Sequence, residues 1–191
     1  MRSLSILLVP SMLAALLALP AAPAGAAELA GVQMADSTKI GDQTLVLNGL
    51  GLRKKAIFKV YVAGLYLPRK TSNPDQVFAS GEPRKLKMEF VRDVGRDSLV
   101  GAWNDCLEAN NANADDTVRA GFGRLNEAMD DVSDGDRLVF TFDPAQGTEI
   151  MVRGEVKATV EGEAFADALF RCWIGPVPPS ADFRTGLLGG D

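Results

Sequence analysis

The segment 50–67 restricts the fold of this chain more than any other part of the sequence. It is rich in Val, Ile, Phe and Tyr, which favour β-structure. Its second part, 57–67, is apolar at almost every position, which is typical of a central strand in a sheet covered on both faces. Pro68 ends this run. The whole segment is too long for one simple strand.

Further β-prone runs lie on both sides of the predicted helices. Residues 44–47 end at Asn48-Gly49, a dipeptide that favours a tight turn. Residues 85–91 alternate polar and apolar, which predicts a half-buried strand. Three runs separated by turn residues, 137–142, 148–152 and 156–160, predict an antiparallel meander.

Apolar stripes at helical spacing predict the helices. One or two turns over 73–80 begin at Pro74, and a longer helix is capped by Asp97 or Ser98. Asp115 or Asp116 starts another helix. The last runs over 163–173, ends at Gly175-Pro176, and is followed by a loop that packs Leu187 and Leu188 against the body. These elements predict an α+β fold, an antiparallel sheet with its helices packed on one face.

Residues 1–27 have the pattern of a Sec-type signal peptide. Arg2 precedes an apolar stretch over 4–19 and a small, proline-broken stretch over 20–27, so cleavage is expected after Ala26 or Ala27. A membrane anchor is the rival interpretation, but polar residues and prolines interrupt the apolar run. We therefore expect one domain over 28–191, in the periplasm or secreted, with no membrane span after the leader is removed.

Charge and composition exclude several classes of function. The net charge of −5 at pH 7 disfavours nucleic acid as a partner, because phosphate binding needs a basic face. The chain has no histidine, which excludes Ser-His-Asp and Cys-His catalysis and any zinc site that requires His. The acidic pairs Asp115-Asp116 and Asp130-Asp131 are interpreted as solvated helix ends. We expect no bound metal and no cofactor.

The two cysteines, Cys106 and Cys172, lie on apolar faces of predicted helices. An oxidising compartment allows a disulfide between them, and apolar positions equally suit two buried thiols. Both alternatives stay open from the sequence. A redox role is disfavoured, because no Cys-x-x-Cys pair is present.

Several local motifs resemble the chalcone isomerase-like family, in its bacterial branch. They are LNGLGLR at 47–53, FKVYVAGLYL at 58–67, FADAL at 165–169, WIGPVPP at 173–179 and GLLG at 186–189. The resemblance covers residues 42–189. It implies an open-faced sandwich with a cleft between the sheet and the helices, and a superfamily of plant isomerases, fatty-acid-binding proteins and non-catalytic relatives.

The resemblance also implies a site. Arg53 matches the family's best-known polar residue of the cleft. Tyr61 stands where catalytic isomerases tend to carry Thr and fatty-acid binders Tyr. The further Lys, Tyr and Asn of the isomerases find no match, and the region 92–104 where they would fall has no Tyr. The chain therefore departs from the isomerase pattern.

These residues suit the binding of an acidic lipophile. Arg53 can hold a carboxylate through two parallel N–H bonds, and Tyr61 adds a hydroxyl on an apolar ring. Lys59 is either a second cation or an exposed residue. The alternative to ligand binding is a structural role, in which Arg53 only pairs strands and Tyr61 only fills the core. On one straight strand the two would lie roughly 26 Å apart, so sharing a head group requires a reversal or strong bulge between Lys54 and Phe58.

Three functions follow as hypotheses. The first is a periplasmic, non-catalytic protein that binds a small amphiphilic acid such as a fatty acid. The second is an isomerase (an intramolecular lyase) acting on a chalcone-like or enone substrate, in which Arg53 stabilises an enolate-like oxyanion. The third is an accessory protein of the cell envelope with no small ligand. We favour the first, because the isomerase partners find no match.

Overall fold

A computed structural model describes residues 25–79 and 81–190, so most of the predicted signal peptide, residues 1–24, lies outside the described residues. The strands are β1 Ala26–Leu29, β2 Val32–Ala35, β3 Ser37–Ile40, β4 Gln43–Lys55, β5 Phe58–Leu67, β6 Arg84–Phe90, β7 Arg137–Asp143, β8 Gly147–Val152 and β9 Glu155–Val160. The helices are α1 Pro74–Ala79, α2 Arg96–Asn110, α3 Asp116–Glu127, α4 Glu163–Ile174 and α5 Ala181–Leu187. None of these helices is long and apolar enough to cross a bilayer.

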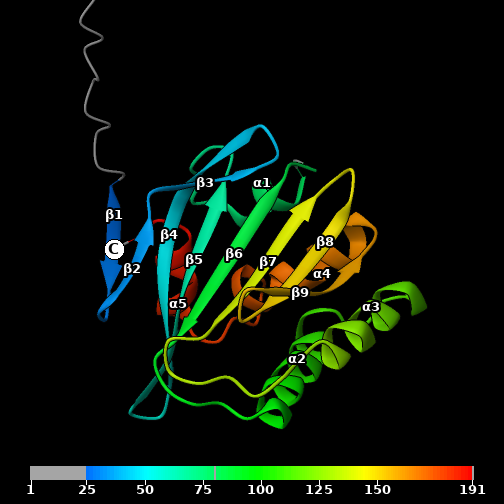
Figure 1. The fold of residues 1–191 in the computed structure, drawn as a ribbon. Coiled ribbons are helices and arrows are strands. Elements are labelled where there is room, and N and C mark those ends of the chain that lie inside the picture. The colour runs from blue at the N-terminus through cyan, green and yellow to red at the C-terminus, as the bar shows by residue number, and fades with distance from the viewer. Residues whose placement is uncertain (1–24, 80, 191) are drawn as a thin grey trace, which may run out of the picture.

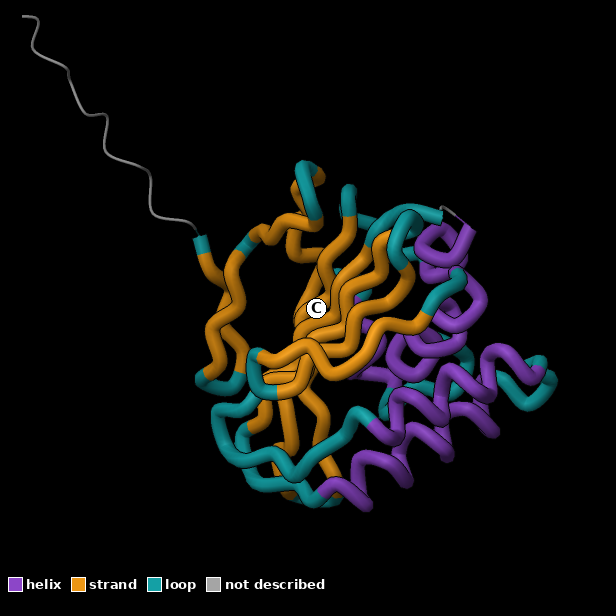
Figure 2. The backbone as a smooth tube through the Cα atoms, turned by 45° about the vertical axis from the view of Figure 1, so that its right-hand side comes forward, coloured by secondary structure: helices purple, strands orange, loops and turns teal. Residues whose placement is uncertain are grey.

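The strands β3 to β9 form one antiparallel sheet in which the spatial order equals the chain order (Figure 1). Figure 2 shows the helices on one side of this sheet and the separate β1–β2 hairpin on the other. The predicted α+β class, an antiparallel sheet with helices on one face, is confirmed. The predicted meander over 137–160 is also confirmed, as β7, β8 and β9.

From Tyr61 to Leu67 strand β5 is buried on both faces, as its apolar sequence predicts, whereas Ile57 and Phe58 at the start of the apolar run are exposed. Tyr61 and Leu65 belong to the main core, which the helices cover. Val62 and Tyr66 point to a second cluster, where Met34 and other residues of the β1–β2 hairpin cover the opposite face. Successive side chains of a strand point to opposite faces, so both covers are needed to bury this run. No strand or helix was predicted before residue 44, so β1 to β3 are additions to the predicted elements.

The long segment 50–67 turns back on itself. Strand β4 ends at Lys55, β5 begins at Phe58, and Ala56 takes a φ of 53° in the turn. Because the two strands pair antiparallel, Arg53 lies directly opposite Tyr61. The expected reversal between Lys54 and Phe58 is confirmed.

The turn predicted at Asn48-Gly49 is wrong, because β4 continues through it with a shift of register. The buried Asn48 side chain donates to the backbone carbonyl of Leu187 at 2.7 Å and of Thr71 at 3.1 Å, and it accepts from the Thr71 N–H at 2.8 Å. These distant contacts hold the backbone extended where the local dipeptide favours a turn.

A loop was predicted after Pro176, but this part of the chain also contains the helix α5. The Ser180 hydroxyl caps this helix by accepting from the Phe183 N–H at 3.2 Å. Gly49 of β4 lies so close to α5 that a Cβ there would stand 2.1 Å from the Gly186 carbonyl oxygen. The predicted packing of Leu187 against the body is confirmed, since its side chain is fully buried.

The predicted helix starts are partly confirmed. Asp115 caps α3 by accepting from the Val118 N–H at 2.9 Å. The cap of α2 was predicted wrongly: Gly95 stands at the N-cap without a side-chain bond, and Asp97 and Ser98 lie inside the first turn. The first turn of α2 is held instead by Asp131, whose carboxylate accepts from the Arg96 N–H at 2.8 Å.

A buried arginine that the sequence analysis missed joins β6 to α4. Arg84 is 1% exposed and pairs with Asp167. Its guanidinium lies 4.7 Å from the centre of the Phe142 ring and 5.1 Å from that of Phe170. Burial lowers the pKa of Arg84, and the Asp167 carboxylate opposes this shift. A cation at this depth is tolerated because its carboxylate partner and the ring faces compensate for lost water.

Two glycines of α3 provide a matched test of the packing against α4. A Cβ at Gly121 would stand 2.4 Å from Cδ2 of Phe165, whereas a Cβ at Gly123 would meet nothing within 4 Å. We expect Gly121→Ala to lower the free energy of unfolding by about 1–3 kcal/mol through overpacking. Gly123→Ala should raise it by about 0.5–1 kcal/mol through helix propensity. Urea denaturation measures both, and equal effects of the two substitutions would contradict this account of the interface.

Candidate functional site

A hollow of about 220 Å³ lies between one end of the sheet and the helices α2 and α4. Tyr61, Trp103 and Trp173 reach it, and all three are buried residues. The other lining residues are Arg53, Ala102, Asp105, Cys106, Ala109, Cys172, Val177, Pro178 and Pro179. A larger hollow of about 510 Å³ between α3 and β9 has no buried residue in its lining. The hollow at Arg53 combines buried aromatic walls with polar groups, as a small-ligand site does.

Arg53 and Tyr61 meet at this hollow because they are opposite partners on β4 and β5. Only one nitrogen of the Arg53 guanidinium donates hydrogen bonds to the described residues. Its Nη1 donates to the Lys54 carbonyl at 2.7 Å and to the Pro179 carbonyl at 3.1 Å. Within residues 25–79 and 81–190, Nε and Nη2 have no hydrogen-bond acceptor. One edge of the guanidinium thus remains available to a ligand.

The phenol of Tyr61 is held at the boundary between sheet and helices. Its oxygen accepts a hydrogen bond from Trp173 Nε1 at 3.3 Å, and its ring lies 5.6 Å from that of Phe90 and 5.8 Å from that of Phe183. Burial raises the pKa of Tyr61 to about 12, against the opposing influence of the Trp173 bond and the Arg53 charge. At neutral pH this side chain is therefore a protonated donor and not a base.

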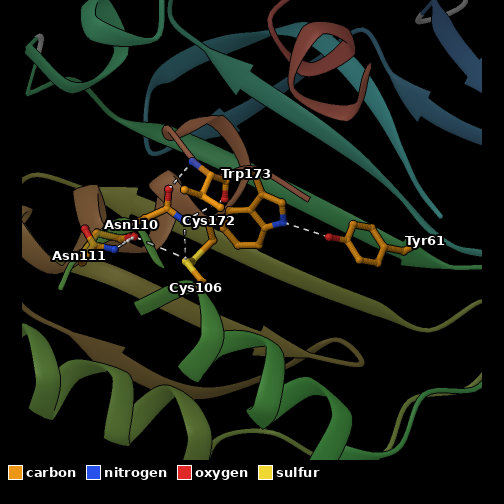
Figure 3. The surroundings of a disulfide bond; sticks show 8 residues. Tyr61, Cys106, Asn110, Asn111, Cys172 and Trp173 are labelled. Atoms are coloured by element: carbon orange, nitrogen blue, oxygen red, sulfur yellow. Dashed lines mark hydrogen bonds between the residues drawn. A yellow bond between two sulfur atoms is a disulfide. The ribbon is translucent and has the colours of Figure 1, made fainter. Parts of the chain in front are cut away.

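A disulfide forms part of the wall on the helix side. Cys106 of α2 and Cys172 of α4 are bonded, with their Cα atoms 5.3 Å apart, so of the two alternatives the structure has the disulfide. Figure 3 shows this bond beside Trp173, which points to Tyr61. Asn110, one turn after Cys106, holds the backbone of Val177 with two hydrogen bonds of 2.9 and 3.0 Å. The disulfide thus links α2 covalently to α4, and the hydrogen bonds of Asn110 link α2 to the loop 177–179.

Lys59 does not line the hollow. It is exposed and pairs with Lys54, because a register shift between Arg53 and Lys54 makes β5 irregular just before Tyr61. The structure thus brings Arg53 and Tyr61 together and leaves Lys59 outside. Asp105, an exposed carboxylate on α2, also lines the hollow and adds a negative charge to it.

Helix α2 lines the hollow with residues that were not predicted as ligand contacts. Relative to Ala102, the residues Asp105, Cys106 and Ala109 follow after three, four and seven positions, so the four form one stripe of the helix. The alanines of this stripe, on either side of Cys106, leave space beside the helix and could have indicated a hollow there. The aromatic pair Trp103 and Trp173 is buried in the core beside this stripe.

Chemically, the arrangement offers one permanent cation, one neutral hydroxyl donor and buried aromatic rings. These groups can hold an anionic head and an apolar body. The indole N–H of Trp103 is buried and lacks an acceptor among the described residues. No cluster of Cys, Asp and Glu that could hold a metal ion occurs in the described part of the chain.

Comparisons with known proteins give two findings. The chain matches the model of a family described as chalcone isomerase-like over residues 26–189. Its structure is similar to that of a fatty-acid binding protein from Arabidopsis thaliana, with a TM-score of 0.67 and 18% sequence identity, over 86% of this chain and 96% of that one. At this identity the likeness shows a common fold alone. A comparison with curated proteins found no match.

The raised pKa of Tyr61 can be tested by ultraviolet titration, because the chain has only two tyrosines, Tyr61 and Tyr66. Burial raises the pKa of both to about 12. The folded protein should therefore show little phenolate absorbance at pH 10 to 11, whereas the protein in urea should show it near pH 10. Tyr61→Phe should halve the change.

The same pKa shift makes stability depend on pH. Above pH 10 the unfolded chain loses the Tyr61 proton while the folded chain keeps it until about pH 12. The contribution of Tyr61 is therefore complete below pH 10 and is lost between pH 10 and 12, about 3 kcal/mol in all. A free energy of unfolding with the same slope over this range in Tyr61→Phe would contradict the shift.

The disulfide should contribute strongly to stability, because it closes a loop of 66 residues. Chain entropy predicts a loss of about 4 kcal/mol when Cys106 and Cys172 are both replaced by Ala. Urea unfolding with and without a reductant measures this loss. The reductant should destabilise the wild-type protein and leave the double variant unchanged. Equal unfolding midpoints of oxidised and reduced wild-type protein would rule the contribution out.

Proposed function

We propose that this chain, which belongs to the chalcone isomerase-like family, binds a small acidic lipophile at Arg53 and Tyr61 and does not transform it. The observation that carries the proposal is the open edge of the Arg53 guanidinium, which lies at an apolar hollow opposite a protonated phenol. The fold shared with a plant fatty-acid binding protein is consistent with this reading.

The head group of the ligand would be a carboxylate. Nε and Nη2 of Arg53 provide the planar pair of donors that matches two carboxylate oxygens, and the Tyr61 hydroxyl provides a third donor. A hydrogen bond to a charged group contributes about 1.5–3 kcal/mol. A ligand oxygen near Trp103 would also satisfy an indole N–H that is otherwise buried without a partner in the described residues.

The volume of the hollow limits the body of the ligand. A dry cavity of about 150 Å³ is enough for one benzene ring. The hollow of about 220 Å³ therefore suits a single ring or a short aliphatic chain. A longer chain would have to leave past the loop 177–179, where Val177 is 54% exposed. We infer an aromatic acid or a medium-chain fatty acid as the class of ligand.

The isomerase alternative is weaker on chemical grounds. General acid–base catalysis works best with a group whose pKa lies near the working pH. The raised pKa of Tyr61, about 12, makes its phenolate rare at neutral pH, and the chain contains no histidine to replace it. Arg53 could stabilise an oxyanion, but among the described residues the only carboxylate that lines the hollow is Asp105, at its exposed side.

We also propose that the protein works in the periplasm after removal of a signal peptide over residues 1–27. The leader pattern of the sequence supports this location. The disulfide between Cys106 and Cys172 supports it independently, since such bonds persist in oxidising compartments and are rare in the cytosol.

Calorimetric titration with decanoate, and with decanol as an uncharged ligand of equal chain length, tests the proposal. We expect decanoate to bind more tightly than decanol. Arg53→Gln should weaken decanoate about 10- to 100-fold and leave decanol nearly unchanged. Asp105→Asn should tighten decanoate, because it removes the negative charge in the lining.

Arg69→Gln is the matched control, since Arg69 is exposed, follows the far end of β5 by two residues and pairs with Glu82. It should leave both affinities unchanged. The proposal fails if decanoate and decanol bind equally, if Arg53→Gln binds decanoate as wild type does, or if the protein turns over a chalcone faster than the spontaneous reaction in an Arg53-dependent manner.

A further inference from the structure

The turn between β4 and β5 projects from the sheet, at its lower end in Figure 1. We call residues 54–59 the β4–β5 tip. Within the tip, Lys54 pairs with Lys59 and Lys55 with Phe58. Strand β3 leaves β4 at Val46, and β6 joins β5 only from Tyr61 onward. No other described strand pairs with the tip, so it extends beyond the rest of the sheet.

The apex of the tip is apolar and faces solvent. Ile57 is 87% exposed and Phe58 is 54% exposed. Among the large hydrophobic residues exposed in the described part of the chain, these two are adjacent, whereas Val156 and Val177 stand singly. Single exposed apolar side chains are ordinary, but an Ile-Phe pair at the end of a projecting hairpin is a feature of interaction sites.

Cations surround this apolar apex. Lys54, Lys55 and Lys59 are exposed on the tip, and the Arg92 guanidinium lies 4.8 Å from the centre of the Phe58 ring. The segment 43–74 contains six cations and no acid, in a chain whose net charge is −5. Within the described residues, neither the three lysines of the tip nor Arg92 forms an ion pair with a carboxylate.

We infer that the β4–β5 tip docks the protein on an anionic lipid bilayer. Ile57 and Phe58 enter the boundary between head groups and acyl chains, as the apolar side of an interfacial segment does. The lysines behind them reach lipid phosphates, and their methylene stems lie beside the apolar apex. The apolar apex reaches deeper than the lysines, just as the acyl chains of a bilayer lie deeper than its phosphates.

This order distinguishes a bilayer from other partners. Nucleic acid would need cations at the most advanced point, where the tip has Ile57 and Phe58. A second copy of the chain, joined apex to apex, would bring two sets of lysines together, and like charges repel. The docking does not depend on the proposed ligand, since no residue of the tip lines the hollow.

Vesicle partitioning tests the inference. The purified protein is sedimented with vesicles of phosphatidylcholine that contain phosphatidylglycerol, and with vesicles of phosphatidylcholine alone. We expect binding to the anionic vesicles that falls with added salt. Each of Lys54→Gln and Lys55→Gln should weaken it about fivefold. Joint Ile57→Ser and Phe58→Ser should remove most of it. All variants carry the same N-terminus, so differences between them report on the tip.

Val156→Ser and Lys70→Gln are the matched controls. Val156 is a singly exposed apolar residue near the β8–β9 turn, and Lys70 is an exposed cation outside the tip. Both should bind vesicles as the wild type does, and circular dichroism verifies that every variant is folded. As a direct reading of depth, Ile57→Trp should show fluorescence quenched by brominated lipid, and Val156→Trp should not.

Equal binding to neutral and anionic vesicles, or unchanged binding in the tip variants, overturns the inference. So does a dimer in sedimentation equilibrium that Ile57→Ser dissociates while vesicles bind nothing, since the tip would then join two copies. Decanoate affinity is measured without vesicles, so failure of the ligand proposal and failure of docking are seen separately.

Discussion

Reversal of the chain at Ala56 places Arg53 opposite Tyr61, and both the hollow and the β4–β5 tip exist because of it. Ala56 takes a left-handed conformation that costs roughly 1 kcal/mol for a residue with a Cβ. Cross-strand pairing on both sides of the turn offsets this cost. This single turn thus places a cation and a phenol together at the base of the hairpin and exposes an Ile-Phe pair at its end.

The site itself is held from two directions. Tyr61 belongs to the sheet, and its oxygen accepts from Trp173 of α4, so the hydrogen bond ties the two layers at the hollow. The disulfide joins α4 to α2 on the other side, and Asn110 extends this support to Val177. A ligand therefore meets walls arranged before it arrives, which reduces the ordering cost of binding.

Periodicity in the sequence predicted the elements whose burial follows from local pattern: β5, β6, the meander, and the stripes of the main helices. It failed where distant contacts override local preference. Asn48 binds the carbonyl of Leu187, 139 residues away, and so stays in a strand. The resemblance identified Arg53 and Tyr61, but the position of Lys59 depends on an irregularity of register that no pattern in the sequence marks. Arg84 was missed because its burial requires Asp167 of α4.

The disulfide has a consequence for how the protein matures. Cys106 and Cys172 are the only thiols in the sequence, so oxidation within the chain has a single product. Four cysteines would allow three pairings, and most of them would have to be reshuffled. This chain needs only an oxidant that removes two electrons, and no enzyme that corrects mispaired sulfurs. Its native bond can form as soon as α2 and α4 come together, because Cys106 has no other cysteine in the chain to pair with before then.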